Sequence, residues 1–195
     1  MTLHLESGCS ATAVRGGKSV DTSMGFTPLE GLVMGKCGDI DPAIVGYLAR
    51  KENVKVDEIE EWLNKKSGLL RLSGVSHDTR VLMKQIESNK RVQLAMDVFC
   101  YRAQKYIGGY LAVIGGAAAV VFGGGIGEDT PYVRTQICGG FEWCGLTLDP
   151  QRNQQTINCE GRISTDDSKL HAYVIVVEEG LMIAQEASCY QNSNI

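Results

Sequence analysis

Five consecutive apolar residues, Ala118 to Phe122, lie between a long helical pattern and a cluster of glycines. A strand without polar residues is typical of one covered on both faces, as in the parallel sheets of α/β proteins. The preceding segment, Asn89 to about Ile114, predicts one long amphipathic helix. Its apolar face consists of Val92, Ala95, Met96, Phe99, Ala103, Tyr106 and Ile107. A helix on each side of such a strand predicts an α/β chain.

The other patterns add short strands and helices around this unit. Strands are expected at Thr2–Leu5, Ser10–Val14, Ser19–Thr22 and His171–Val177, and helices at 41–51, Asp57–Leu63, 130–139 and from Leu181 to about Glu186. Residues 67–76 read as a glycine-rich loop, and the polar residues 188–195 are expected to form a disordered tail. This order predicts one domain over residues 1–187, in which a mixed sheet carries helices on both faces.

Composition narrows the class of protein. The net charge is −4 and no Lys/Arg cluster exceeds two or three residues, which argues against a nucleic-acid partner. The seven cysteines form no Cys-x-x-Cys pair and no metal-like spacing with histidine, which favours free thiols in a reducing compartment. No leader pattern opens the chain, and the most apolar stretch, 110–122, is too short to span a bilayer. A cytoplasmic protein without a membrane partner is expected.

The glycine cluster from Gly123 to Asp129 could bind a ligand. Its four glycines would let backbone N–H groups approach a ligand, and the helix behind them favours negative charge. A phosphate or the ribose end of a nucleotide suits this place. The cluster is not the dinucleotide-binding fingerprint, because Glu128 stands where the third glycine would be. On the residues alone, an ordinary glycine-rich turn between a strand and a helix is an equal alternative.

The segment from Lys18 to Lys36, KSVDTSMGFTPLEGLVMGK, follows no single amphipathic period. It closely resembles the signature of the acetate kinase family of short-chain carboxylate kinases, and the resemblance runs from His4 to about Glu186. It implies the actin-like/sugar-kinase ATPase fold (ribonuclease H-like), an α/β domain. It also implies that residues 1–187 correspond to the second, C-terminal domain of such an enzyme.

The resemblance implies three nucleotide-binding segments. They are His4, Leu5, Glu6, Ser7 and Gly8; Asp78, Thr79 and Arg80; and Gly125, Ile126, Gly127, Glu128 and Asp129. The chain departs from the family pattern at three places, since Glu6 replaces a glycine, while Ser7 and Asp129 each replace an asparagine. The carboxylate of Glu6 would repel phosphate. Asp78 could also cap a helix, a role that is compatible with a nucleotide contact.

The resemblance also points to a catalytic cation and a metal ligand. Residues 35–39 align with the family's Gly-Thr-Arg-Ser-Gly-Asp, but one residue is missing and no arginine is present. Lys36 is the nearest cation and is a weak substitute for that arginine, because lysine lacks the bidentate guanidinium. A loop lysine without a catalytic role is the alternative. Glu179 falls on the family's magnesium-associated glutamate, which implies Mg²⁺ with ATP or ADP; an acidic first turn of a helix is the alternative.

Members of this family interconvert acetate and ATP with acetyl phosphate and ADP, and dimerise through the second domain. No part of this chain matches the first domain, which would supply the acceptor site, so the chain alone is expected to bind nucleotide without turnover. A homodimer is expected to involve the long helix, with Val98, Tyr101 and Tyr110 beyond its core stripe. The alternatives are a diverged, non-catalytic nucleotide-binding or interaction module, and a kinase that acts on propionate or butyrate.

Overall fold

The computed structural model describes residues 1–193, and its centre is a six-stranded mixed sheet. The strands are β1 (Thr2–Leu5), β2 (Cys9–Arg15), β3 (Lys18–Thr22), β4 (Ala119–Gly123), β5 (Gly161–Arg162) and β6 (His171–Val174). Their order across the sheet is β3-β2-β1-β4-β6-β5. β1, β4 and β6 run parallel to one another, whereas β2, β3 and β5 are antiparallel to their neighbours. The carboxyl ends of β1, β4 and β6 therefore meet at one edge of the sheet.

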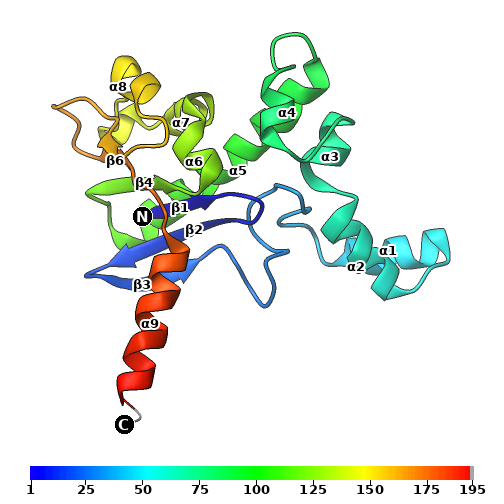
Figure 1. Ribbon diagram of the computed structural model, residues 1–195. Helices are drawn as coiled ribbons and strands as arrows, with labels where there is room; N and C mark the ends of the chain where they lie inside the picture. The colour runs from blue at the N-terminus through cyan, green and yellow to red at the C-terminus, as the bar shows by residue number, and fades with distance from the viewer. Residues whose placement is uncertain (194–195) are drawn as a thin grey trace.

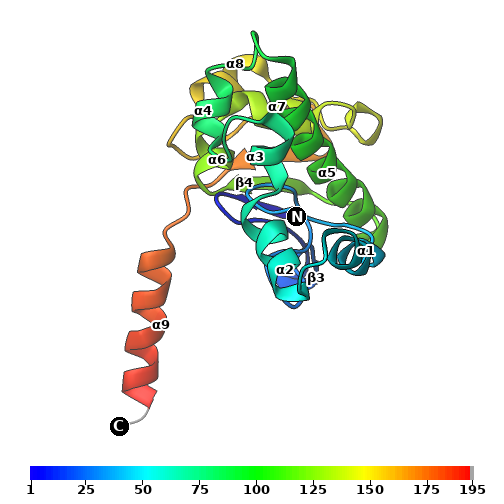
Figure 2. The same cartoon turned by 90° about the vertical axis from the view of Figure 1, so that its right-hand side faces the viewer.

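Nine α-helices and one 3-10 helix occur in the described part of the chain. They are α1 (Ala43–Glu52), α2 (Val56–Lys65), α3 (Gly68–Ser73), α4 (Thr79–Met83), α5 (Lys90–Ile114), α6 (Gly125–Asp129), α7 (Pro131–Cys138), η1 (Glu142–Cys144), α8 (Pro150–Gln155) and α9 (Glu179–Ser193). Figures 1 and 2 show α5 and α7 against the sheet, and α9 standing away from the rest of the protein. None of the helices among residues 1–193 combines the length and apolar character needed to cross a bilayer.

The long helix α5 confirms the predicted amphipathic pattern. The side chain of Asn89 accepts hydrogen bonds from the N–H groups of Arg91 and Val92, which caps the start of the helix. Gly115, with φ 72°, ends it in the left-handed conformation that glycine adopts readily. All residues of the predicted apolar face are buried except Tyr106, which is half-buried.

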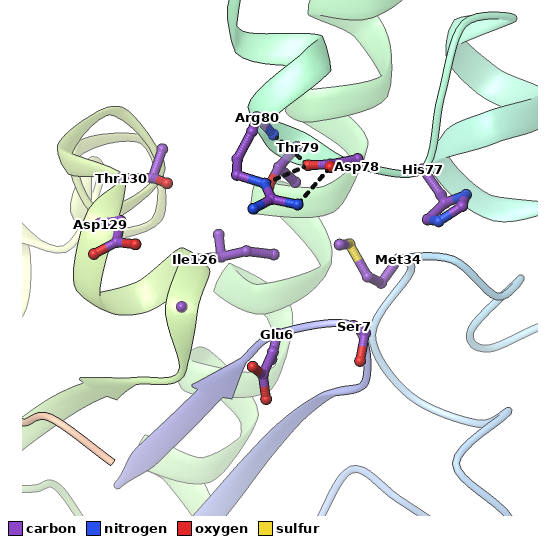
Figure 3. A pocket seen from close by; sticks show the side chains of 11 residues that line it. Glu6, Ser7, Met34, His77, Asp78, Thr79, Arg80, Ile126, Asp129 and Thr130 are labelled. Atoms are coloured by element: carbon purple, nitrogen blue, oxygen red, sulfur yellow. Dashed lines mark hydrogen bonds and ion pairs between the residues drawn. The ribbon is translucent and has the colours of Figure 1, made fainter. Parts of the chain in front are cut away.

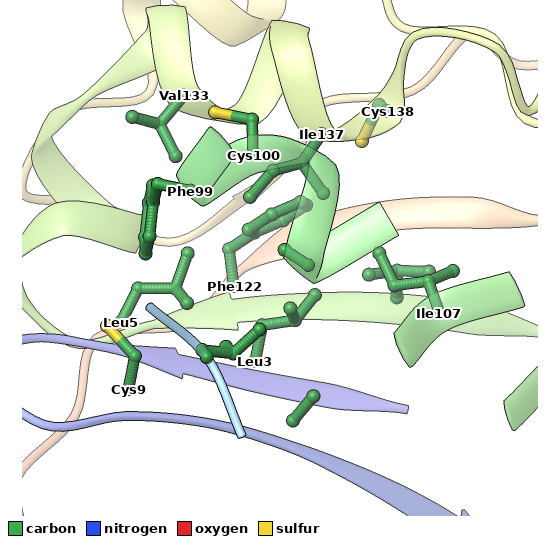
Figure 4. Packing of buried hydrophobic residues seen from close by; sticks show 14 of the residues in the cluster. Leu3, Leu5, Cys9, Phe99, Cys100, Ile107, Phe122, Val133, Ile137 and Cys138 are labelled. Carbon is green, nitrogen blue, oxygen red and sulfur yellow. The ribbon is translucent and has the colours of Figure 1, made fainter. Parts of the chain in front are cut away.

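One face of the sheet packs against the helices and forms the core. Leu3, Leu5 and Phe122 meet Phe99 of α5 and Ile137 of α7, as Figure 4 shows, and all of them are fully buried. Apart from the buried Gly123, the residues that alternate with these along the strands are exposed or only partly buried on the opposite face.

The α/β actin-like fold is confirmed, but the covering of the sheet differs from the prediction. Residues that alternate along β4, such as Val121, are only partly buried, so the strand is not enclosed on both faces. The last helix, α9, extends away from the sheet and does not cover this face (Figure 1). The apolar composition of β4 was a misleading signal, because small and β-branched residues also occur on half-exposed sheet faces.

The loop expected at residues 67–76 is instead largely the helix α3. Its two glycines bound the helix: Gly68 has φ 57° and Gly74 has φ 71°. Leu69 is fully buried, and α3 packs against α5, so tertiary packing outweighs the local glycine signal. Two other boundaries shift: β6 ends at Val174, before the predicted Val177, and α9 continues to Ser193 through the region expected to be a tail.

Candidate functional site

A cavity of about 350 Å³ opens at the sheet edge where β1, β4 and β6 end. Figure 3 shows the side chains around it, which come from the β1–β2 turn, the segment between β3 and α1, the start of α4, and α6 with the residue that follows it. The lining residues are Glu6, Ser7, Met34, His77, Asp78, Thr79, Arg80, Gly125, Ile126, Asp129 and Thr130. All three segments that the sequence assigned to nucleotide binding contribute to this one cavity.

The glycine-rich segment 124–129, called the α6 loop below, exposes its main chain to the cavity at Gly125. Gly125 lines the cavity, and a Cβ built on it would have no heavy atom within 4 Å. Gly124, immediately before it, has φ 74°, and a Cβ there would lie 2.8 Å from the carbonyl oxygen of Leu5. Gly124 therefore lets the loop pack against β1, whereas Gly125 leaves open space in which a ligand can approach the main chain.

Glu128 of this loop is turned into the protein. The residue is 8% exposed, and its Oε1 accepts hydrogen bonds from the N–H of Gly124 at 2.8 Å and the N–H of Val177 at 3.0 Å. Its side chain is not among those that line the cavity. Sequence reasoning placed Glu128 with the nucleotide contacts, but the carboxylate instead holds two backbone segments together.

Arg134, which sequence analysis did not single out, fixes the other end of α6. Its guanidinium is fully buried and donates to the carbonyl oxygens of Gly127 and Glu128, each at 2.8 Å. It also donates to Asn153 Oδ1 at 2.7 Å and to the carbonyl oxygens of Asn153 and Thr156. Burial lowers the pKa of Arg134 to about 10, so the side chain remains a cation at neutral pH. Arg134 thus bridges the loop, through two hydrogen bonds, to Asn153 and Thr156 at the end of α8, through three.

Asp78 and Arg80 form an ion pair at the opposite wall. Asp78 caps α4 by accepting from the N–H of Arg80, and its carboxylate receives Nε and Nη2 of Arg80 at 3.1 and 2.8 Å. These bonds lower the pKa of Asp78 to about 2. The structure confirms the capping role and shows that the cationic Arg80 is already paired. His77 is exposed at the rim beside this pair.

Two apolar side chains face each other across the cavity. Figure 3 shows Ile126 and Met34 pointing toward one another from opposite sides. Both are buried at the level of the whole residue, as is Thr79 beside them. A flat apolar ring with polar edges suits such a slot, because most ligand pockets combine apolar walls with a few oriented polar groups. Sequence analysis missed Met34 because the residue is far in sequence from the glycine loop with which it lines the cavity.

Of the five residues predicted to bind nucleotide at the end of β1 and in the β1–β2 turn, only two line the cavity. Glu6 and Ser7 line the cavity, and Leu5 is fully buried in the core. His4 lies on the half-exposed face of β1, with Nε2 at 3.5 Å from a carboxylate oxygen of Glu6 and at 3.6 Å from one of Glu179. Figure 3 shows the Glu6 carboxylate turned away from Ile126 and Arg80. Gly8 follows the turn but does not line the cavity.

Glu179 begins α9 just beyond the sheet edge, as expected of a residue that follows the last strand. Its side chain is 66% exposed and lies beside His4. No group of three or more His, Cys, Asp or Glu side chains within residues 1–193 has an arrangement that could hold a metal by protein ligands alone. Mg²⁺ does not require such a group, since it is usually held by one or two carboxylates together with phosphate oxygens and waters. An exposed carboxylate at this edge fits that mode of binding.

Lys36 lies outside the cavity lining, although Met34 two residues earlier is part of it. Its carbonyl oxygen accepts from the N–H of Met34, and a Cβ on Gly68 would lie 2.5 Å from the same oxygen. Asp39 then ties the segment to α5, since it bonds Tyr106 at 2.8 Å and Arg102 at 2.7 Å. The backbone of the segment is well fixed, but the Lys36 ammonium is not brought to the cavity.

Comparisons with known proteins identify the family to which the chain belongs. The sequence profile of the Acetokinase family matches residues 1–185. Acetate kinases from Solibacter usitatus and Dictyoglomus thermophilum are 52% and 53% identical over 95% of the chain. Crystal structures of an acetate kinase from Porphyromonas gingivalis and a propionate kinase from Francisella tularensis superpose with TM-scores of 0.92 and 0.88, at 40% and 41% identity over 95% of the chain. The chain spans about half the length of these relatives, between 46% and 47%.

Proposed function

Because the chain belongs to the acetokinase family, we propose that it is the nucleotide-binding and dimerisation half of an acetate kinase-type phosphotransferase. The complete reaction would interconvert acetate and ATP with acetyl phosphate and ADP. The observation that carries the proposal is the convergence of three separate segments, 6–7, 78–80 and 125–129, on one cavity at the carboxyl edge of the sheet. Ligands of open α/β sheets bind at this edge.

In this proposal the adenine lies between Ile126 and Met34, with the start of α4 on one side and the Gly125 backbone on the other. The apolar walls would cover the faces of the ring, and Thr79 and the main chain would meet its polar edge. The phosphates would extend toward the β1–β2 turn, where Ser7 offers a hydroxyl group. Because the Glu6 carboxylate lies beside His4, it leaves space for a phosphate but adds negative charge near it.

Glu179 is the proposed ligand for Mg²⁺, with phosphate oxygens completing the coordination. Bound there, the metal would neutralise charge on the phosphates and orient them for transfer. Glu179 and Glu6 flank His4 at 3.6 and 3.5 Å, so a cation at this edge would also relieve the repulsion between two carboxylates.

The acceptor side of the reaction requires groups beyond this chain. In-line transfer needs the carboxylate held against the terminal phosphoryl and cations on the developing charge. Arg80 is paired with Asp78, and Lys36 does not line the cavity, so the residues described here supply the nucleotide side only. We propose that a first domain of the family type completes the site, with a cytoplasmic location for the complete enzyme.

A second candidate is a diverged module that binds nucleotide or another protein without catalysis. Two observations favour it: Glu6, Ser7 and Asp129 depart from the family pattern, and Lys36 lies outside the cavity lining. The 41% identity with a propionate kinase keeps propionate, or butyrate, as an alternative acceptor. The residues that would choose between acids belong to the acceptor side of the site.

An assay of acetyl phosphate formation tests the proposal. We expect the 195-residue chain alone to show no acetate-dependent transfer, and addition of a family first domain to restore it. Glu179→Gln should abolish the restored activity. Glu160 is an exposed carboxylate that does not line the cavity, so the control Glu160→Gln should retain the activity. Restored turnover that survives Glu179→Gln would contradict the proposed metal role, and binding of Mg-ADP without any restored turnover would favour the non-catalytic module.

A further inference from the structure

The buried carboxylate of Glu128 connects two backbone segments that are distant in sequence. One oxygen of Glu128 accepts from two backbone N–H groups that are far apart in sequence, those of Gly124 and Val177. Gly124 starts the loop on which the nucleotide would rest. Val177 lies in the link between β6 and α9, two residues before Glu179. A single atom therefore joins the nucleotide loop to the segment that carries the proposed metal ligand.

The link from β6 to α9 has little other support at this point. The last hydrogen bond between β6 and β4 beyond the strand runs from the N–H of Ile175 to the carbonyl oxygen of Phe122, at 2.9 Å. The helix begins after Val177, where the carbonyl oxygen of Glu178 accepts from Leu181 and Met182. Val177 is thus held between these two regions by its bond to Glu128.

The two segments are also packed closely. A Cβ on Gly123, the last residue of β4, would lie 2.7 Å from Cγ2 of Val177, so the small glycine lets the link approach the end of the strand, immediately before the loop. Arg134 fixes the carbonyl oxygen of Glu128 itself from the other side. Because Glu128 is anchored at its main chain and buried at its side chain, displacement of the α6 loop would be transmitted to Val177.

We propose that Glu128 is a positioning residue that couples nucleotide binding on the α6 loop to the placement of the Glu179 carboxylate. This inference rests on the proposed function, because it concerns the same nucleotide and metal site. Nucleotide seated on Gly125 holds the loop, the Glu128 carboxylate holds Val177, and Val177 sets the start of α9. Loss of the acceptor would leave the two N–H groups unpaired and free the link to move.

Calorimetry with ADP, in the presence of Mg²⁺ and in the presence of a chelator, measures this coupling on the full chain. The quantity of interest is the factor by which Mg²⁺ tightens ADP binding. Glu128→Met, which keeps the length of the side chain but removes the acceptor, should reduce that factor about 5-fold to 10-fold. Glu128→Gln keeps an oxygen that can accept both N–H groups and should retain most of it. In a Glu179→Gln background, Glu128→Met should change the factor no further.

Amide hydrogen exchange supplies a readout that does not depend on the metal. ADP should slow exchange at Val177 in the unsubstituted chain and in Glu128→Gln, but not in Glu128→Met. Additive effects of Glu128→Met and Glu179→Gln on the Mg²⁺ factor would overturn the coupling. So would the absence of any ADP effect at Val177 in the unsubstituted chain, a measurement that remains decisive even if Glu128→Met fails to fold. If that chain binds no ADP at all, the proposed function fails first.

Discussion

Two adjacent glycines in the α6 loop are subject to different constraints. Gly124 is required by the fold, because its φ is positive and a side chain there would meet the Leu5 backbone. Gly125 has no positive φ, and a Cβ added to it would have no heavy atom within 4 Å. The fold itself therefore does not require glycine at position 125, and a side chain there would interfere only with a bound ligand. Substitutions at the two glycines can thus separate the stability of the loop from its role in binding.

Alanine substitutions at these two positions should affect stability to different extents. Gly124→Ala should lower the free energy of unfolding by more than about 1 kcal/mol, since it combines a positive φ with a contact of 2.8 Å. Gly125→Ala should leave it within about 0.5 kcal/mol of the unsubstituted value. Urea unfolding of both variants measures the difference. Equal losses would show that the loop does not pack against β1 as described.

The Asp78–Arg80 pair should make a pH-dependent contribution to stability. The pKa of Asp78 is lowered to about 2 by Arg80, so the pair stabilises the folded chain above the unfolded pKa of about 4. That stability should be lost as the pH falls from about 4 toward about 2. Asn caps helices as well as Asp does, so Asp78→Asn removes the ion pair and spares the cap. The gap in urea midpoint between the two proteins should close over this range; a constant gap would assign the stability elsewhere.

At the level of helices and strands, the sequence predicted an element correctly where its apolar periodicity and its capping residues indicate the same bounds. Helix α5 has both a continuous apolar face and the Asn89 cap, and its boundaries agree within one residue. Helix α3 was missed because Gly68 and Gly74 suggest a loop, whereas its burial against α5 depends on contacts that are distant in sequence. Tyr110, expected at a dimer interface, is 5% exposed and packs in the core toward β2.

The exposed side of α5 still offers a surface for self-association. Leu94, Val98 and Tyr101 follow one another at helical spacing, and Leu94 and Tyr101 are 54% and 58% exposed. Such a strip suits a two-fold interface in which the same helix meets its copy. We expect sedimentation to show a dimer, and Tyr101→Glu to shift it toward monomer. Val20→Glu, at a similarly exposed apolar residue on β3, is the control. A monomer at high concentration without any substitution would remove this prediction.

For the protein as a whole, motif resemblance predicted which segments meet, and packing decided how each side chain is used. The three predicted segments do line one cavity, but Leu5 belongs to the core and Glu128 to the link with α9. Arg134 carries no motif signal, because a buried arginine is recognisable only by the five acceptors that surround it. Met34 likewise reaches the cavity through tertiary structure alone.

Titration calorimetry of the 195-residue chain with Mg-ADP tests most directly whether the cavity binds nucleotide. We expect one site per chain. Gly125→Val should weaken binding at least about tenfold, or about 1.4 kcal/mol, because the side chain would occupy space that the ligand needs. Gly108→Val, at a glycine of α5 that is equally free of neighbours and lies outside the cavity lining, should leave the affinity unchanged. Absence of Mg-ADP binding, or equal affinity in the Gly125→Val variant, would contradict the assignment of the cavity as the nucleotide site.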